Sequence, residues 1–318
     1  MNAALFPGQG SQHINMGRDL YEEFPFLKRH FEEAEDILKE PLRHWIFNGC
    51  ERELRHTQKA QPSLFVVSMA IMKVIECEFG VSAPSFSFMA GHSLGEYSAL
   101  CAAKCFSFAV GVALIKERSR IMACAPQGGM AAILGLTALD VQALIPQVDP
   151  CYGVCEMAND NASHQVVVSG TLEALKVLES LAYEAKASKV VFLNVSGAFH
   201  SSLMRLAQQE FAVILENTEF SPPVCPVIPN VCAYSSRCAI ELKTHLIAQM
   251  AHPVLWRPTM LYLQDQGVDS VVEVGPGKVL CGLLKRTLPL MDSHALGDFS
   301  VFKHWVSTLS RQFIPLAI

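Results

Sequence analysis

The sequence predicts an α/β fold in which a small domain of strands and helices is inserted into a larger one. Short apolar runs typical of strands alternate with longer amphipathic stretches typical of helices. One predicted strand leads directly into a serine flanked by glycines, and a separate group of strands and helices lies between residues 128 and 193. With 318 residues, the chain is long enough for a well-buried core and more than one domain. We expect residues 1–126 and 197–318 to form the larger domain and residues 127–196 the small one.

The larger domain opens with a strand over residues 3–6 that ends at Pro7-Gly8-Gln9-Gly10. A helix over residues 62–79 is expected to begin near Pro62, because proline at an early helical position loses no hydrogen bond. The other elements expected before the small domain are a strand over 86–90 and helices over 24–38, 96–104 and 111–122.

The small domain shows the element order β-α-β-β-α-β, which is that of a ferredoxin-like unit. Thr137 and Asp140 form a pattern typical of a helix N-terminal cap, and Asn159-Asp160-Asn161 is typical of a turn. The larger domain is expected to resume near Ser196. The predicted strands cover residues 130–134, 155–158, 165–168 and 189–193, and the predicted helices cover 137–145 and 171–186.

Composition excludes several classes of protein. A formal charge of −5 gives no general reason to expect nucleic acid or an anionic membrane as a partner. The N-terminus lacks the pattern of a signal peptide, and no apolar run approaches the roughly 20 residues that span a bilayer. Eleven scattered cysteines indicate reduced thiols in a cytoplasmic protein. No further ligands accompany the C-x3-C pairs at Cys101/Cys105 and Cys151/Cys155, so we expect no metal.

Ser93 is the candidate nucleophile. Gly91-His92-Ser93-Leu94-Gly95 matches G-x-S-x-G, in which a sharp strand-to-helix turn exposes the serine hydroxyl and glycines let the backbone pass. The backbone N–H of Leu94 then points to where an oxyanion would form. The pattern alone also fits an ordinary glycine-rich connection. The strand predicted before it and the helix predicted after it favour the nucleophile.

His200 is the candidate base for that hydroxyl. It lies in a turn of small residues, Gly197 to Ser202, before a helix predicted from Leu203 onward. It also follows the serine in chain order, as in hydrolase-type sites. Taken alone, a structural histidine would fit this position about as well. The side chain of His92, beside the serine, is expected to diverge from it and to have a supporting role.

Arg118 is a charge where a core residue is expected. Placed at 100° intervals on a helix, it falls in the middle of an apolar arc. Burying a guanidinium costs folding free energy unless an anion pairs with it. A structural salt bridge or a side chain that reaches out to solvent would explain it, as would a clamp for a substrate carboxylate, which suits arginine. The arc is lined by Leu114, Ile115, Ile121 and Met122.

Five segments together resemble one enzyme family, the malonyl-CoA:acyl carrier protein transacylases of bacterial fatty acid synthesis. The likeness runs from the N-terminus to about Arg286, and it implies an α/β-hydrolase-like core with an inserted ferredoxin-like domain. The segments are Phe6-Pro7-Gly8-Gln9-Gly10-Ser11-Gln12, Gly91-His92-Ser93-Leu94-Gly95-Glu96, Arg118, Gly197-Ala198-Phe199-His200-Ser201 and Glu273-Val274-Gly275-Pro276-Gly277.

The resemblance implies a mechanism. Ser93 would attack the malonyl thioester of coenzyme A while His200 takes its proton, and the backbone N–H groups of Gln9 and Leu94 would hold the oxyanion. The phosphopantetheine thiol of acyl carrier protein would then take the malonyl group from the serine. In this family a main-chain carbonyl orients the base, and the matching position is Gln249.

The resemblance also implies residues that bind the acyl group. Arg118 would pair with the malonyl carboxylate, beside His92. Asn161 matches a position near the substrate, although the family's Asn-Ser-Pro-Gly-Gln reads Asn161-Ala162-Ser163-His164-Gln165 here. Phe199 resembles the malonyl-preferring branch, whereas branches that take methylmalonyl tend to carry serine there. One methyl group changes selectivity by only about 1–3 kcal/mol. No cofactor is implied, and we expect a monomer.

Three other functions fit parts of the pattern. A trans-acting acyltransferase of a polyketide pathway would use the same chemistry with a different carrier protein. A serine esterase or thioesterase would pass the acyl group to water, but no Asp with triad context is evident between Ser93 and His200. A catalytically inactive binding module would not need Ser93, His200, Arg118 and Gln9 all intact.

Overall fold

The strand that opens the chain lies at the centre of a parallel sheet. In the computed structural model, which describes residues 1–195 and 197–313, five parallel strands lie in the order β7-β2-β1-β8-β9. Residues 3–6 are all fully buried, as expected where helices cover both faces of a parallel sheet. The strands are β1 (Asn2–Phe6), β2 (Phe88–Gly91), β7 (Val227–Ile228), β8 (Ser270–Glu273) and β9 (Asp292–Ala295).

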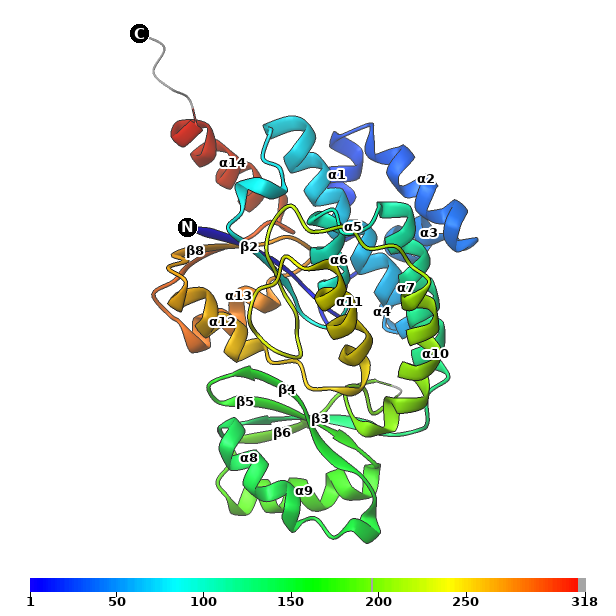
Figure 1. The fold of residues 1–318 in the computed structure, drawn as a ribbon, viewed down its shortest axis with the longest axis vertical. Coiled ribbons are helices and arrows are strands. Elements are labelled where there is room, and N and C mark those ends of the chain that lie inside the picture. The colour runs from blue at the N-terminus through cyan, green and yellow to red at the C-terminus, as the bar shows by residue number, and fades with distance from the viewer. Residues whose placement is uncertain (196, 314–318) are drawn as a thin grey trace.

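Helices pack around this sheet (Figure 1). The 23-residue α5 is buried along most of its length and packs against α2, α3, α4, α6 and α7. The helices around the parallel sheet are α1 (Arg18–Glu23), α2 (Leu27–Leu38), α3 (Leu42–Phe47), α4 (Glu51–Leu54), α5 (Thr57–Phe79), α6 (Leu94–Ala102), α7 (Phe108–Ala123), α10 (Arg205–Glu216), α11 (Ala239–Ala248), α12 (Trp256–Asp265), α13 (Val279–Thr287) and α14 (Phe299–Phe313).

Three predicted helices have different limits in the structure. The helix expected over residues 24–38 starts later, at Leu27 of α2, because Pro25 follows the non-helical Phe24 that ends the separate helix α1. Helix α5 starts at Thr57, so Pro62 lies inside it and not at its beginning. The helix expected from residue 203 starts at Arg205, after a 3-10 turn over Ser202–Met204.

A four-stranded antiparallel sheet forms the second part of the molecule, below the parallel sheet in Figure 1. Its strand order is β4-β5-β3-β6, and the predicted order β-α-β-β-α-β is confirmed. The predicted cap is also confirmed, because Thr137 and Asp140 form a capping box at the start of α8. The elements are β3 (Gly129–Leu134), α8 (Ala138–Leu144), β4 (Cys155–Ala162), β5 (Gln165–Gly170), α9 (Leu172–Glu184) and β6 (Lys189–Phe192).

The turn predicted at residues 159–161 is wrong, because these residues belong to strand β4. Contacts with the larger part hold them extended. The backbone N–H of Asp160 donates to Val254 O at 3.0 Å, and Val254 N–H donates to Ala158 O at 2.9 Å. The Asp160 carboxylate also accepts hydrogen bonds from Nε and Nη2 of Arg257 on α12, at 2.8 to 3.1 Å. Tertiary pairing therefore overrides the local turn preference of this segment.

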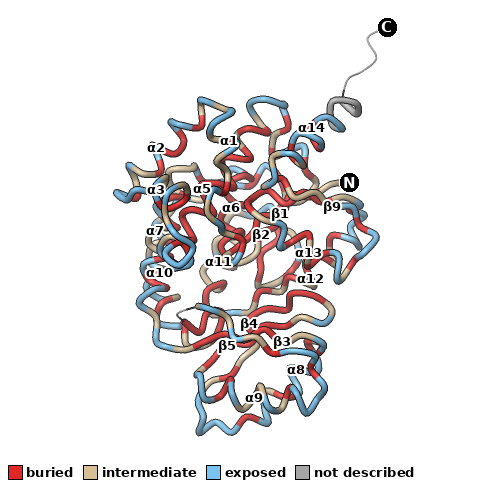
Figure 2. The backbone as a smooth tube through the Cα atoms, turned by 180° about the vertical axis from the view of Figure 1, so that it is seen from behind, coloured by how far each residue is buried: buried red, intermediate tan, exposed pale blue. Residues whose placement is uncertain are grey.

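Buried backbone follows β1 and β2 in one sheet and β4 and β5 in the other (Figure 2). The antiparallel sheet carries α8 and α9 against one side, while β4 contacts α12 and α13 of the larger part. The predicted resumption of the larger domain near Ser196 lies outside the described residues.

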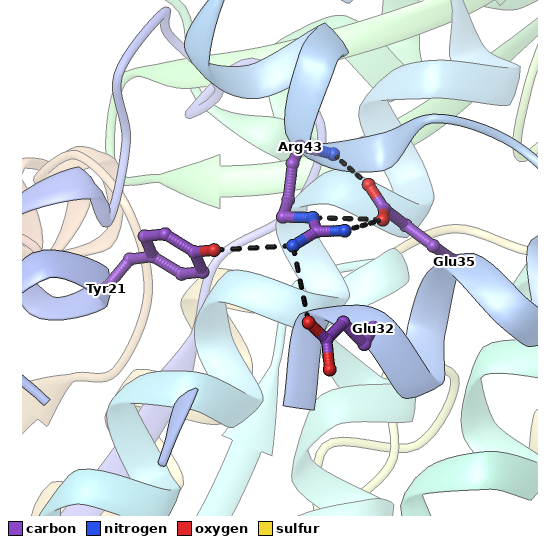
Figure 3. Close-up of polar contacts among 4 residues, drawn as sticks. All are labelled: Tyr21, Glu32, Glu35 and Arg43. Atoms are coloured by element: carbon purple, nitrogen blue, oxygen red, sulfur yellow. Dashed lines mark hydrogen bonds and ion pairs between the residues drawn. The ribbon is translucent and has the colours of Figure 1, made fainter. Parts of the chain in front are cut away.

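An ion pair fixes the corner formed by the first three helices (Figure 3). The Arg43 guanidinium donates to Glu35 Oε2 through Nε at 2.9 Å and Nη2 at 2.6 Å, and its Nη1 donates to the Tyr21 hydroxyl at 3.3 Å. Glu32 lies 3.7 Å from the same Nη1. The two-point contact is the strong form of this interaction, so it holds the start of α3 against α2.

Within residues 1–195 and 197–313, no helix is long and apolar enough to cross a membrane. The same part of the chain holds no group of three or more His, Cys, Asp or Glu side chains placed to bind a metal ion. Cys101, Cys105, Cys151 and Cys155 are all free thiols.

Candidate active site

Ser93 lies at the turn between β2 and α6, with its backbone at φ 51° and ψ −106°. A non-glycine residue held there is strained by about 1–3 kcal/mol, and such strain clusters at functional sites. The turn needs its glycines, because a Cβ on Gly91 would lie 1.9 Å from Gly95 O, and one on Gly95 would lie 2.0 Å from Phe6 O. The pattern therefore places the serine hydroxyl at the carboxyl end of the parallel strands.

His200 meets this hydroxyl. Its Nε2 lies 2.8 Å from Ser93 Oγ, and its backbone has φ 61°. Its Nδ1 faces two main-chain carbonyl oxygens, those of Gln249 at 3.0 Å and His252 at 3.2 Å. Carbonyl oxygens only accept hydrogen bonds, so Nδ1 carries the ring proton and Nε2 is left to accept from Ser93. The structure thus brings Ser93, His200 and Gln249 together.

The environment of His200 keeps its ring neutral. Burial is the main reason that its pKa falls to about 3, and the positive charge of Arg118 is the second. Hydrogen bonds to the carbonyls of Gln249 and His252 oppose this fall only in part. The imidazole is consequently unprotonated at neutral pH, as a proton acceptor must be.

Arg118 is only 1% exposed, so it does not reach out to solvent. Its Nη2 lies 3.2 Å from Ser93 Oγ and 3.1 Å from Gln249 Oε1, and its Nη1 donates to Gln61 Oε1 at 2.6 Å. Its guanidinium carbon lies 5.1 Å from the centre of the Tyr97 ring. Among the described residues no carboxylate forms a salt bridge with it, so the structural salt bridge is also excluded. A buried cation beside the hydroxyl has neutral partners only.

Gln249 connects these groups and is itself fully buried. Its side-chain Nε2 donates to Ser93 O and to Glu96 Oε2, each at 2.8 Å, while its Oε1 accepts from Arg118. Asn230 braces the same turn, since its Oδ1 accepts from Ser93 N–H at 2.7 Å and its Nδ2 donates to Gly91 O at 2.7 Å. The turn, the histidine and the arginine are therefore held by one hydrogen-bonded network.

Four residues around the site were not predicted from the sequence: Gln61, Glu96, Tyr97 and Asn230. Glu96 and Tyr97 follow the serine directly, and a polar residue at 96 on a fully buried helix could have signalled them. Gln61 lies next to Pro62 on the apolar helix α5, which offers a similar signal. Asn230 lies 137 residues from Ser93, and no local pattern points to it.

A cavity of about 100 Å³ opens beside Ser93. Its polar lining includes Gln9, Gln61, Arg118 and His200. Both parts of the molecule provide its apolar walls, which are Leu94, Met122, Met130, Leu193, Val195 and Phe199. Its small size suits a short acyl group.

The other predicted residues lie at or next to this cavity. Gln9 and Leu94 line it, and the Gln9 side chain is fixed because its Oε1 accepts from the Thr57 hydroxyl at 3.1 Å. His92 lines it as well, and its Nε2 lies 2.8 Å from Asn161 Oδ1. Asn159 lines the cavity, whereas Asn161 supports His92. Burial lowers the pKa of His92, so this ring is neutral too.

A serine hydroxyl at a strand-to-helix turn, bonded to a histidine whose other nitrogen is fixed, defines the class of enzymes that work through serine esters. Comparison with known proteins agrees with this class and narrows it. The chain belongs to the acyl transferase family, because the model of the acyl transferase domain matches residues 4–297.

Relatives and solved structures of this family resemble the chain over almost its whole length. The malonyl CoA-acyl carrier protein transacylase of Bacillus subtilis is 38% identical and covers 98% of each chain. A polyketide biosynthesis malonyl CoA-acyl carrier protein transacylase of the same species is 39% identical over 89% of this chain and 95% of its own. The solved acyl-carrier-protein-S-malonyltransferase of Bartonella henselae has a TM-score of 0.93 and 36% identity, covering 97% of this chain and 99% of that one.

Proposed function

We propose that this protein transfers a malonyl group from malonyl-CoA to the phosphopantetheine thiol of acyl carrier protein, through a malonyl ester of Ser93. One observation carries the proposal. The buried guanidinium of Arg118 lies 3.2 Å from the Ser93 hydroxyl and has no carboxylate partner among the described residues. An acyl group bound to Ser93 therefore meets a positive charge, which a carboxylate neutralises and an uncharged acyl group does not.

In the first step Ser93 Oγ attacks the thioester carbonyl carbon while its proton passes to Nε2 of His200, 2.8 Å away. The backbone N–H groups of Leu94 and Gln9 stabilise the negative oxygen that forms. The bond from carbon to sulfur then breaks, and the departing coenzyme A thiolate takes the proton from His200. The product is the malonyl-serine ester and free coenzyme A.

The second step repeats this chemistry with a new nucleophile. His200 takes the proton of the phosphopantetheine thiol, and the sulfur attacks the ester carbonyl. The bond from carbon to Ser93 Oγ breaks, and the serine oxygen recovers the proton. Carbonyls of Gln249 and His252 hold the imidazole in the same orientation throughout, because both accept from Nδ1–H.

The malonyl carboxylate also improves the base. Arg118 is the second cause of the low pKa of His200. A carboxylate paired with Arg118 offsets that charge, so the pKa of His200 rises toward the working pH, where a general base is most effective. His92, held by Asn161, and Phe199 bound the acyl group on its other sides.

The predicted division of the chain into two domains fits this function. We infer an α/β-hydrolase-like core from residues 1–126 and 197–318, supported by a parallel sheet with the nucleophile at a strand-to-helix turn. Residues 127–196 would form the small domain, whose side chains Met130 and Leu193 close the cavity. The chemistry needs neither a metal nor an organic cofactor. A monomer and a cytoplasmic location remain predictions.

A polyketide pathway is the second candidate setting. The relative from Bacillus subtilis named for polyketide biosynthesis is 39% identical, against 38% for the transacylase named without that pathway. The chemistry at Ser93 is the same in both, and only the carrier protein differs. We favour the carrier protein of fatty acid elongation, because the relative that covers 98% of both chains has the general name.

The test is intact-protein mass spectrometry after brief exposure to malonyl-CoA, followed by a carrier protein bearing phosphopantetheine. The wild type is expected to gain one malonyl group and to lose it to the carrier thiol, while Ser93→Ala gains none. Ser98→Ala is the matched control, since this buried serine lies five residues further along, within α6. Release of free malonate in place of malonyl-carrier would identify a hydrolase. Absence of any adduct would refute the proposal.

A further inference from the structure

Glu96 is a buried carboxyl that the mechanism above does not use. It follows Ser93 by one helical turn on α6 and is fully buried. Its Oε2 accepts from Gln249 Nε2 at 2.8 Å and from Asn230 N–H at 3.0 Å. Its Oε1 has no hydrogen-bond partner among the described residues. A proton can therefore be added at Oε1 without breaking a hydrogen bond.

Glu96 is linked to Arg118 through a single side chain. Gln249 donates from Nε2 to Glu96 and accepts at Oε1 from Arg118 Nη2, 3.1 Å away. The amide cannot be turned around, because arginine only donates and a carboxylate only accepts. The free protein thus holds one cation and one carboxyl group on opposite ends of the same buried amide.

Binding of a malonyl carboxylate to Arg118 changes the charge balance of this cluster. Two carboxyl groups then share one guanidinium away from water, and like charges that share a site disfavour ionisation of both. We propose that Glu96 is a positioning residue that takes up a proton when the malonyl group occupies Arg118, and releases it when the malonyl group leaves. This inference rests on the proposed function.

The groups around Glu96 favour this behaviour. Burial raises the pKa of Glu96 to about 7, while the bonds from Gln249 and Asn230 and the charge of Arg118 lower it. The other titratable groups that interact with it are Tyr97 on the same helix and the Cys232 thiol after β7, and the pKa of each is raised. Both are therefore neutral near pH 7, which leaves Arg118 as the charged group that interacts with Glu96.

The uptake is measured with a pH indicator in weak buffer at pH 8 as the protein is loaded with malonyl-CoA, while mass spectrometry gives the malonylated fraction. Wild type is expected to take up close to one proton more per malonyl-serine than Glu96→Gln does. Coenzyme A released by each protein contributes equally to both traces. Glu273→Gln is the matched control, because Glu273 is equally buried but bonds the backbone N–H groups of Leu280 and Cys281. It should keep the full uptake.

A second measurement needs only the wild type, in case Glu96→Gln fails to fold. Loading with acetyl-CoA brings no carboxylate to Arg118, so malonyl loading should consume close to one proton more than acetyl loading. The KM of the wild type for malonyl-CoA should also rise with pH above about 7, by up to ~tenfold per pH unit.

Equal proton counts for wild type and Glu96→Gln at equal malonylation, or equal counts for the two acyl groups, would overturn the inference and leave the proposed function intact. If no acyl-enzyme forms, the proposed function itself fails, and the two failures are distinguished by the mass spectrum.

Discussion

At the scale of single residues, the function depends on a histidine that stays neutral and an arginine that stays buried. The inward position of Arg118 could be predicted, because helical periodicity places it among apolar side chains, and it is 1% exposed. Its turn of small residues and its place after Ser93 made His200 a candidate base, but only the family resemblance favoured it over a structural histidine, because 107 residues separate the two. Asn230 lies 137 residues from Ser93, and no local pattern reveals it, whereas Gln61 lies 57 residues from Arg118 on the apolar helix α5.

The low pKa of His200 predicts an unusual pH profile. An ordinary histidine base loses its function as pH falls through about 6.5. Here the pKa in the free protein is lowered to about 3, so the base remains neutral far below that point. The pH dependence of kcat/KM reports the pKa values of groups in the free protein. We therefore expect kcat/KM for malonyl-CoA to stay level from pH 7 to pH 5. A tenfold fall per pH unit below 6.5 would contradict this environment for His200.

At the scale of elements, the sequence indicated which segments form strands and helices better than where they pair. Helices α5 and α7 and the ferredoxin-like order were predictable from periodicity, whereas α11 to α14 were not predicted. The two-residue β7 and the four-residue β9 were not, because each is defined by its neighbour in the sheet, β2 and β8 respectively. Strand β4 was cut short at Asn159 for the same reason, since Val254 and Arg257 keep it extended.

Strand β4 also holds the small sheet against the larger part, which gives a prediction for Arg257. The Asp160 side chain is 4% exposed, and its carboxylate forms an ion pair with the Arg257 guanidinium. Arg257→Ala leaves that charge buried and unpaired, so we expect a loss of about 2 kcal/mol or more in the free energy of unfolding by urea. We also expect a several-fold loss of acylation rate, because Asn159 and Asn161 lie on this strand. Arg120→Ala, whose ion pair with Glu210 is exposed, should change neither value appreciably. Equal effects of the two variants would contradict this role for β4.

At the scale of the whole molecule, the cavity exists only where two sheets meet. Ser93 follows β2 of the parallel sheet, and Met130 lies on β3 of the antiparallel sheet. The sequence predicted both units. It did not predict how they dock, because Asp160–Arg257 and Glu156–Ser202 join residues that are far apart in the chain.

The stability of the whole molecule should depend on a second buried histidine, His30. It is stacked on Phe108 and bonded through Nε2 to Val66 O. Burial lowers its pKa to about 4, so between pH 6.5 and 4 the unfolded chain binds a proton that the folded one does not. Stability present above pH 6.5 is therefore lost as pH falls, by roughly 3 kcal/mol in total. Urea titrations at pH 7 and pH 4.5 should show a smaller fall for His30→Leu than for the wild type. Identical falls would show that His30 is not responsible.

The most direct test of malonyl transfer through a buried cation is the ratio of kcat/KM for malonyl-CoA to that for acetyl-CoA in wild type and Arg118→Met. Both substrates use the same Ser93 and His200, so general damage to the site lowers both values and cancels in the ratio. We predict a fall of about a hundredfold or more in the ratio, since the variant leaves the malonyl carboxylate buried without a counter-charge. An unchanged ratio would contradict the assignment of Arg118, and with it the observation on which the proposed function rests.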